Sequence, residues 1–200
     1  MSPIPLPTPD VKGNISVEEA IARRRSIRRY LPQPLTLSQL GQVLWVCQGV
    51  THGRFRACPS AGASYPLEVF ALVGEGGVEG LEAGVYHYEI KGHALSLTAS
   101  GDRRTQVASA SLDQRFLREA PVTIVVGAIY GRTTEYYGQR GERYIHFEVG
   151  HVGQDVHLQA LALGLGTVMV GAFKDEEIAG ILGLEKEVRP LYLMPVGFPR

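Results

Sequence analysis

The segment Pro121–Tyr130 constrains the fold most, because it contains the run Val-Thr-Ile-Val-Val and no charged side chain. Continuous β-branched and apolar residues over this length indicate a strand that is buried on both faces. Such a strand needs neighbouring strands at its sides and helices above and below it. We therefore expect a central sheet in which Pro121–Tyr130 is an inner strand.

Further strands and helices are interleaved along the chain. Two capping boxes, Ser16-Val17-Glu18-Glu19 and Thr36-Leu37-Ser38-Gln39, predict the starts of helices. The other predicted strands are Leu67–Val73, Val85–Ile90, Ala94–Thr98, Thr167–Val170 and Leu191–Val196. The other predicted helices are Asp102–Ser111, Asp113–Glu119, Glu142–Leu163 and Asp175–Leu182. Hairpins without a regular βαβ repeat predict an α+β fold, with a mixed, mainly antiparallel sheet flanked by helices on both faces.

The composition is that of one globular domain. Of the 200 residues, 44% are hydrophobic, which suffices for a core, and the 20 basic and 20 acidic residues cancel. This balance argues against nucleic acid as a partner. The four prolines in the first ten residues predict an extended arm over residues 1–13, followed by a single domain over residues 14–200. Without an apolar run of about 20 residues or a secretory signal, we expect no membrane association and a cytoplasmic protein.

Several residues of metal-binding type lack the spacing of a metal site. Cys47 and Cys58 are expected to be reduced and structural. Glu148, His151 and Asp155 share one face of a predicted helix, and Glu-x-x-His is a di-iron pattern that needs a second copy, which the sequence lacks. We expect a polar, hydrogen-bonded seam there and no bound metal. The histidines at positions 52, 87 and 93 are expected at the surface.

Five arginines lie within the seven residues Arg23–Arg29. Guanidinium groups match the oxygens of a phosphate in pairs, and Ser26 adds a further donor. The cluster is therefore a candidate phosphate site. Two alternative interpretations are a solvated helix end, where the helix dipole favours cations, and a patch that binds nucleic acid. Because the helix is expected to stop near Ser26, the later arginines leave its regular face and can converge on one small anion.

Three other segments are candidates for ligand contact. The small residues of Ala57–Pro66 let a backbone approach a flat ligand, although the segment is also compatible with an ordinary polar loop. Within Gly164–Phe173 the sequence predicts a helix end, a turn and a buried strand, followed by an exposed backbone at Gly171 and Ala172. The alternative is that the glycines of this segment serve only close packing. The polar segment Gly131–Gly141 is expected to be a mobile excursion from the fold.

In their order and spacing, these segments resemble the nitroreductase superfamily over nearly the whole chain from Ser16. The matching motifs are Arg24-Arg25-Ser26-x-Arg28-x-Tyr30, Pro59-Ser60-Ala61-Gly62-x-x-Tyr65-Pro66 and Gly164-Leu165-Gly166 with Gly171-Ala172-Phe173. Finer features are similar to the SagB-type branch, which includes azoline-oxidising dehydrogenases. These features are Tyr65-Pro66-Leu67-Glu68, Tyr137-Gly138-x-Arg140-Gly141 and Leu193-Met194-Pro195-Val196-Gly197.

The resemblance implies a homodimer that binds FMN where the two subunits meet. It assigns Arg24, Ser26 and Arg28 to the phosphate and ribityl end. Relatives usually add basic residues from a C-terminal tail, a role that falls here either to Arg200 or to Arg25 and Arg29. It assigns Gly171 and Ala172 to backbone N–H contacts with the flavin N5. The residues that it places along the flavin are Pro59, Ser60, Ala61, Gly62 and Ser64.

The resemblance also implies two-electron chemistry, with NAD(P)H as donor and a nitroaromatic or quinone-like acceptor. A SagB-like alternative is oxidation of an azoline or another substrate C–H bond. Tyr136 and Tyr137 are candidate lid contacts, and azoline-oxidising relatives tend to carry Lys-Tyr at these positions. A third alternative is a flavin- or phosphate-binding module without turnover.

Overall fold

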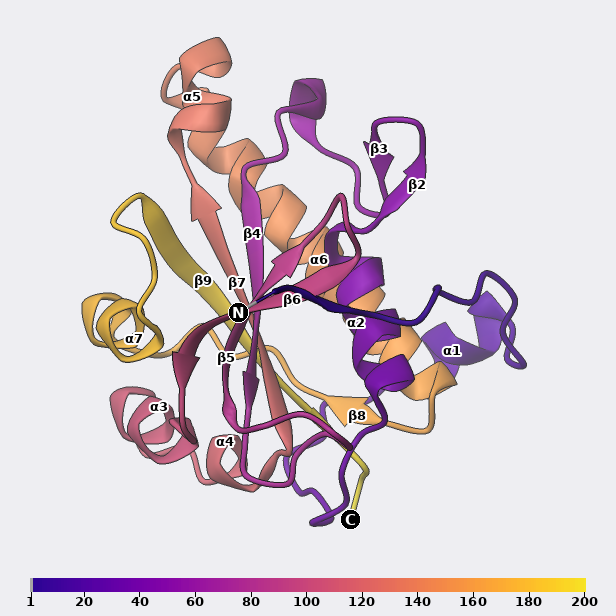
Figure 1. The fold of residues 1–200 in the computed structure, drawn as a ribbon. Coiled ribbons are helices and arrows are strands. Elements are labelled where there is room, and N and C mark those ends of the chain that lie inside the picture. Colours follow the sequence, from indigo (N-terminus) through magenta and orange to yellow (C-terminus); the bar gives the residue numbers. More distant parts are fainter. Residues whose placement is uncertain (1) are drawn as a thin grey trace.

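A seven-stranded sheet forms the centre of the protein, whose residues 2–200 are described by a computed structural model (Figure 1). Its order is β1-β6-β5-β4-β7-β9-β8, and every strand pairs antiparallel with its neighbours. The strands are β1 (Ile4–Pro5), β4 (Leu67–Val73), β5 (Gly84–Glu89), β6 (Ala94–Ser100), β7 (Val122–Ile129), β8 (Gly166–Thr167) and β9 (Val188–Gly197). β7 lies inside the sheet, between β4 and β9, as its apolar sequence predicts.

Helices cover both faces of this sheet, which confirms the predicted α+β class. Alternation along β7 divides the core: Ile124 and Val126 pack on one face, and Val125 packs on the other. The first face is covered mainly by α2 (Leu37–Gln48) and α6 (Arg140–Ala162). The second is covered by α3 (Arg104–Ala110), α4 (Phe116–Glu119) and α7 (Asp175–Leu182). The short α1 (Val17–Arg23) contacts α6.

The two predicted capping boxes differ in the structure. Thr36 forms the full reciprocal box with Gln39 at the start of α2. Ser16 accepts a hydrogen bond from the Glu19 N–H, but the Glu19 carboxylate pairs with Arg23 one turn later. Both helices therefore begin where the sequence predicts, and the first has only half of the predicted cap.

The segment Gly131–Gly141, which the sequence predicts to be a mobile excursion from the fold, is largely helical. It forms α5 (Gly131–Tyr137), and the chain turns at Gly138, with φ +54°, into α6. The apolar periodicity that reveals a helix is missing because α5 rises above the sheet and buries only Thr133. The segment 51–65, which the sequence predicts to be a loop, also contains regular structure. It includes the hairpin of β2 (Val50–His52) and β3 (Phe55–Arg56) and the single helical turn η1 (Ala61–Ala63). The strand predicted at Thr167–Val170 shortens to β8, with one further bridge from Val170 to Leu193.

Two histidines that were expected at the surface are instead half-buried. His87 Nε2 lies 2.7 Å from Glu68 Oε2, and His93 bridges the Tyr88 hydroxyl and the Pro7 carbonyl. The latter contact helps to hold the N-terminal segment, whose strand β1 pairs with β6. His52 is exposed, as predicted.

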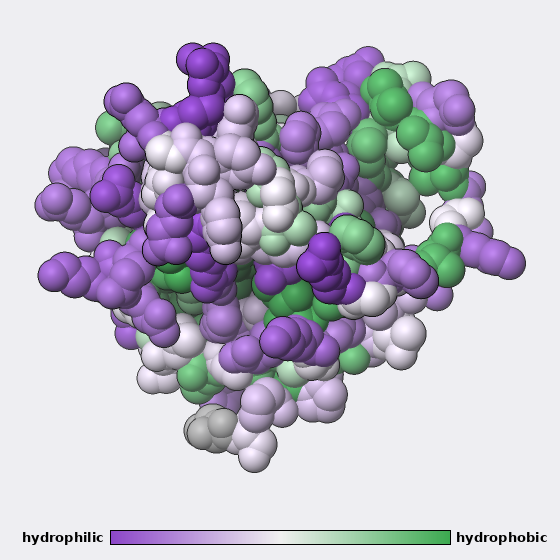
Figure 2. All heavy atoms as spheres, turned by 90° about the horizontal axis from the view of Figure 1, so that it is seen from above, coloured by the Kyte–Doolittle hydropathy of each residue, from purple (hydrophilic) through white to green (hydrophobic). Residues whose placement is uncertain are grey.

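The surface of the α5 end is mainly hydrophilic, with apolar side chains gathered along one edge (Figure 2). Within residues 2–200, no helix has the length and apolar character that crossing a membrane requires.

Candidate functional site

The arginine-rich turn leaves the helix one residue after Arg23. Arg24 has extended backbone angles (φ −52°, ψ 136°) and ends α1. The chain then runs beside β8, where Ser26 bridges Thr167 and the Ile27 N–H donates to the Thr167 carbonyl at 2.9 Å. Ile27 packs against Gly166, whose missing side chain makes room for it, since a Cβ there would lie 2.6 Å from Ile27 Cγ1.

Side chains alternate along an extended segment, so Arg24, Ser26 and Arg28 are expected on the side opposite Ile27. Ser26 and Arg28 are exposed and Arg24 is half-buried. Arg24 lies near His157 of α6. Burial is the larger cause that lowers the pKa of His157, and the positive charge of Arg24 is the smaller one. The turn therefore presents two guanidinium groups and a hydroxyl in the alternating pattern that suits one anion.

The other two candidate cations are placed differently. Arg25 Nη1 donates to the carbonyls of Ala22 and Arg24, so it caps the end of its own helix. The Arg200 N–H donates to the Arg29 carbonyl at 3.1 Å, which brings the C-terminal residue beside the turn. The Arg200 side chain lines a separate cavity of about 400 Å³ together with Arg104 and Arg118.

Gly171 and Ala172 lie on the same connection that begins beside the arginine turn. Both are exposed, and among residues 2–200 no protein acceptor pairs with either backbone N–H. A Cβ at Gly171 would meet only the Tyr192 ring, at 3.8 Å. This exposed stretch thus offers two backbone N–H donors without an acceptor among residues 2–200.

The small-residue loop lies at the other end of the subunit. Ser60 Oγ accepts the Tyr65 N–H at 2.9 Å and closes the loop. Gly62, Ala63 and Tyr65 all have positive φ, at +59°, +53° and +47°. Non-glycine residues rarely adopt this conformation, and strain of this kind clusters at ligand-binding sites.

Helix α5 stands directly over this loop. Thr133 Oγ1 lies 2.8 Å from Ser64 Oγ. Arg132 donates to the Tyr65 carbonyl at 3.2 Å and pairs with Glu68 at 2.6 Å. Tyr137 reaches Gly62, whereas Tyr136 is 80% exposed. The geometry therefore favours Tyr137 over Tyr136 as the lid contact.

One chain holds these elements as two separate halves. Glu148 of α6 lies beside the small-residue loop, since its carbonyl oxygen accepts from the Cys58 thiol at 3.6 Å, and His157 of the same helix lies near Arg24. The two residues are nine positions apart along the helix, a rise of about 14 Å. Figure 1 shows α5 at one end of the subunit and β8 at the opposite end, near the C-terminus.

The polar seam predicted on α6 is only partly present. Glu148 is buried and bonded to Gln48, Asp155 is half-buried and His151 is exposed. Burial is the main cause that raises the pKa of Glu148 to about 7 and that of Asp155 to about 6. Cys47 and Cys58 are both buried and free, as predicted. Among residues 2–200, no group of three or more His, Cys, Asp or Glu side chains is placed to hold a metal ion.

Sequence reasoning missed the partners of Glu148. Gln48 closes α2, and Arg56 follows it in the β2–β3 hairpin, so neither belongs to a recognisable motif. The available signal was weak: an acidic residue between apolar neighbours, Ile145 and Val149, on the inner face of the longest helix.

Known proteins are similar to this chain in sequence and in fold. A protein of Methanocaldococcus jannaschii that is named as a nitroreductase is 46% identical over 94% of this chain and 93% of its own length. The microcin B17-processing protein of Escherichia coli is 30% identical, over 71% of this chain and 54% of its own length. A solved structure from Ralstonia eutropha, titled as a nitroreductase, superposes with a TM-score of 0.85 at 26% identity, over 99% of this chain and 90% of that chain.

The family model described as "Nitroreductase family" matches residues 21–198, which include the arginine turn, the small-residue loop and the Gly171 segment. With that match and the 46% identical relative, the chain belongs to the nitroreductase family.

Proposed function

We propose that this protein is an FMN-dependent oxidoreductase that takes electrons from NAD(P)H and passes them to a nitroaromatic or quinone-like acceptor. The observation that carries the proposal is that the arginine turn pairs with Thr167 through Ser26, four residues before Gly171 and Ala172, whose N–H groups have no acceptor within residues 2–200. Bound FMN would supply the two-electron chemistry, and the protein supplies position and electrostatics. Residues 14–200 form the FMN-binding domain in this proposal, and residues 1–13 form its N-terminal arm.

The residues present suit the two ends of this cofactor. Arg24, Ser26 and Arg28 would hold the phosphate, since guanidinium groups and a hydroxyl supply charged and neutral donors to its oxygens. Gly171 and Ala172 would direct backbone N–H groups at the flavin edge, because neither donor has an acceptor within residues 2–200. Arg25, whose guanidinium caps α1, would contribute charge rather than direct contact.

The active protein in this proposal is a homodimer. Because the loop Pro59–Ser64 and the arginine turn lie at opposite ends of one chain, a second copy would bring its loop over the turn of the first. Ser60, Ala61 and Gly62 of that copy would then line the flavin. Tyr137, which lies against Gly62, would close the ligand side of the site.

A SagB-like dehydrogenase is the second candidate, and the similarity to the microcin B17-processing protein favours it. The residues of α5 favour the first. Azoline-oxidising relatives tend to carry a lysine where this chain has Tyr136, and a tyrosine is a weak acid–base group near neutral pH. Reduction of an acceptor needs no such side chain, because solvent can deliver the proton.

The test is the visible spectrum of the purified protein with FMN, followed by anaerobic addition of NADH or NADPH. Flavin absorbance that bleaches with the nicotinamide and returns with a quinone supports the proposal. Absence of bound flavin would refute it. A bound flavin that neither nicotinamide reduces would point to a SagB-like substrate or to a binding module without turnover.

A further inference from the structure

The backbone span 171–173 lies between two fixed points. On one side, Val170 and Leu193 exchange both backbone hydrogen bonds, at 2.9 and 3.0 Å. On the other side, the Lys174 N–H donates to the Ala110 carbonyl at 3.0 Å. The span is thus fixed at its two ends, and its middle needs a further contact to keep one conformation.

Gln114 supplies that contact from the connection between α3 and α4. Its amide group has two N–H donors, and Nε2 donates to the Ala172 carbonyl at 3.2 Å and to the Ser111 carbonyl at 2.9 Å. Among residues 2–200, the bond to Ala172 is the one hydrogen bond that a protein group makes with the span 171–173. One amide group therefore joins the α3–α4 connection to the span.

The turn that precedes Gln114 has a strained backbone. Leu112 and Asp113 have positive φ, at +57° and +54°, although Leu112 is 71% exposed and gains little from burial. Such strain persists only where the surroundings hold it in place. Here Asp113 Oδ1 accepts hydrogen bonds from Arg118 at 2.5 Å and from the Ser109 hydroxyl at 3.4 Å. The held turn brings Gln114 within reach of the span.

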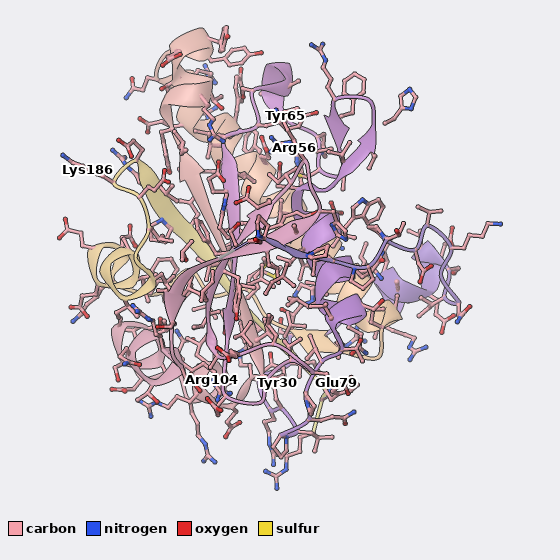
Figure 3. The ribbon with its side chains drawn as sticks, in the orientation of Figure 1. Tyr30, Arg56, Tyr65, Glu79, Arg104 and Lys186 are labelled. Carbon is pink, nitrogen blue, oxygen red and sulfur yellow. The ribbon has the colours of Figure 1, made fainter. Side chains whose placement is uncertain are left out.

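Two arginines at the start of α3 tie this turn to its surroundings. Arg104, labelled in Figure 3, donates through Nη1 to the Ala120 carbonyl at the end of α4, at 3.1 Å. Arg103 donates to the Ile181 carbonyl of α7. Figure 1 shows α3 beside α7, the helix that follows the span. Gln114 therefore projects from a fixed frame.

The bond to the Ala172 carbonyl also restricts the Ala172 N–H. The carbonyl and the N–H belong to the two rigid peptide planes on either side of one Cα atom. Because Gly171 has no Cβ, the plane that carries the Ala172 N–H can rotate there at little steric cost. Without the bond from Gln114, this N–H would be free to turn away from a ligand.

We propose that Gln114 is a positioning residue that fixes the direction of the Ala172 N–H toward the flavin N5. This inference rests on the proposed function, which assigns Gly171 and Ala172 to the flavin edge. A donor that is already held in place spares the cost of ordering the span when the cofactor binds.

The experiment compares FMN with 5-deaza-FMN, in which a C–H group replaces N5 and accepts no hydrogen bond. Calorimetric titration of the cofactor-free full chain gives both affinities. The wild type should bind FMN about threefold to tenfold more tightly than 5-deaza-FMN, as expected for one hydrogen bond. Gln114→Ala should lose this preference, because only its FMN affinity falls. Gln106→Ala, the same change at an exposed position of α3, should keep the preference.

A preference that persists in Gln114→Ala would overturn the inference, even if both affinities fall, because a merely structural role weakens the two ligands equally. Gln114→Met has a similar length and no donor, and it decides the question if Gln114→Ala does not fold. Equal binding of the two ligands by the wild type would overturn the inference and leave the proposed function standing. No FMN binding by the wild type would overturn both.

Discussion

The hydroxyl of Tyr137 lies so close to Gly62 that a Cβ added to this glycine would be 2.7 Å from Tyr137 Oη. The contact joins α5 to the loop that carries Ser60. A side chain at position 62 would displace the Tyr137 ring from this contact. Gly62 is therefore favoured both by its positive φ and by this close approach.

Gly62→Ala should lower stability more than Gly53→Ala does. Both glycines have a φ near +60°, so each substitution costs about 1–2 kcal/mol of backbone strain. Only Gly62 has a neighbour, since a Cβ at Gly53 meets nothing within 4 Å. Thermal unfolding of both variants isolates the Tyr137 contact. Adding Tyr137→Phe to Gly62→Ala should recover part of the loss; no recovery would contradict the contact.

Arg24→Ala and Arg28→Ala should each weaken FMN binding by about tenfold to a hundredfold, the range for a hydrogen bond to a charged group. Arg25→Ala should have a smaller effect, because its guanidinium caps α1. Arg115→Ala is the control, because it removes the same charge from an exposed side chain at the start of α4. Fluorescence titration with FMN at two salt concentrations separates direct contact with the phosphate from long-range electrostatic attraction, which salt screens. Equal losses in all four variants would argue against a phosphate site at the turn.

The proposed dimer predicts complementation between two defective chains. One chain carries Arg24→Ala with Arg28→Ala, and the other carries Ala61→Glu in the loop. Each alone should bind little FMN. A mixed dimer joins an intact turn to an intact loop in one of its two sites, so co-expressed and co-purified chains should bind about half of the normal FMN. Flavin content measured by absorbance gives the answer, and no gain in the mixture would place each site within one chain.

The pair of His87 and Glu68 predicts a pH dependence of stability. The hydrogen bond that His87 donates to the Glu68 carboxylate is the main cause that raises the pKa of His87 above 6.5. Its stabilisation is thus fully present below about pH 6.5 and is lost as the pH rises through the higher folded value. The stability difference between wild type and His87→Gln should be largest near pH 6 and shrink by about pH 9, as followed by chemical denaturation. His52→Gln, at an exposed position, should show no such trend.

Much of the fold could be predicted because its elements bury apolar residues with a clear period. The central strand β7 and the helix α7 form where the pattern places them. Helix α5 was missed because it buries one threonine. His87 was misplaced because its partner is on another strand: β4 and β5 pair Phe70 with His87, which brings Glu68 within reach.

The candidate site was predictable only as separate pieces. The end of α1 before Arg24 can be predicted from the local sequence, and it places the later arginines outside the helix. The burial of Glu148 depends on Gln48, which lies 100 residues away, and no local pattern reveals such a partner.

Helix α6 carries the neighbours of both half-sites, yet in the proposed dimer the halves that cooperate belong to different molecules. Selection for cofactor binding would then couple positions 24–28 with positions 59–62, although one chain keeps them apart. Co-variation among homologues should link these two segments. A contact map inferred from such co-variation would report an intermolecular contact that the isolated subunit does not contain.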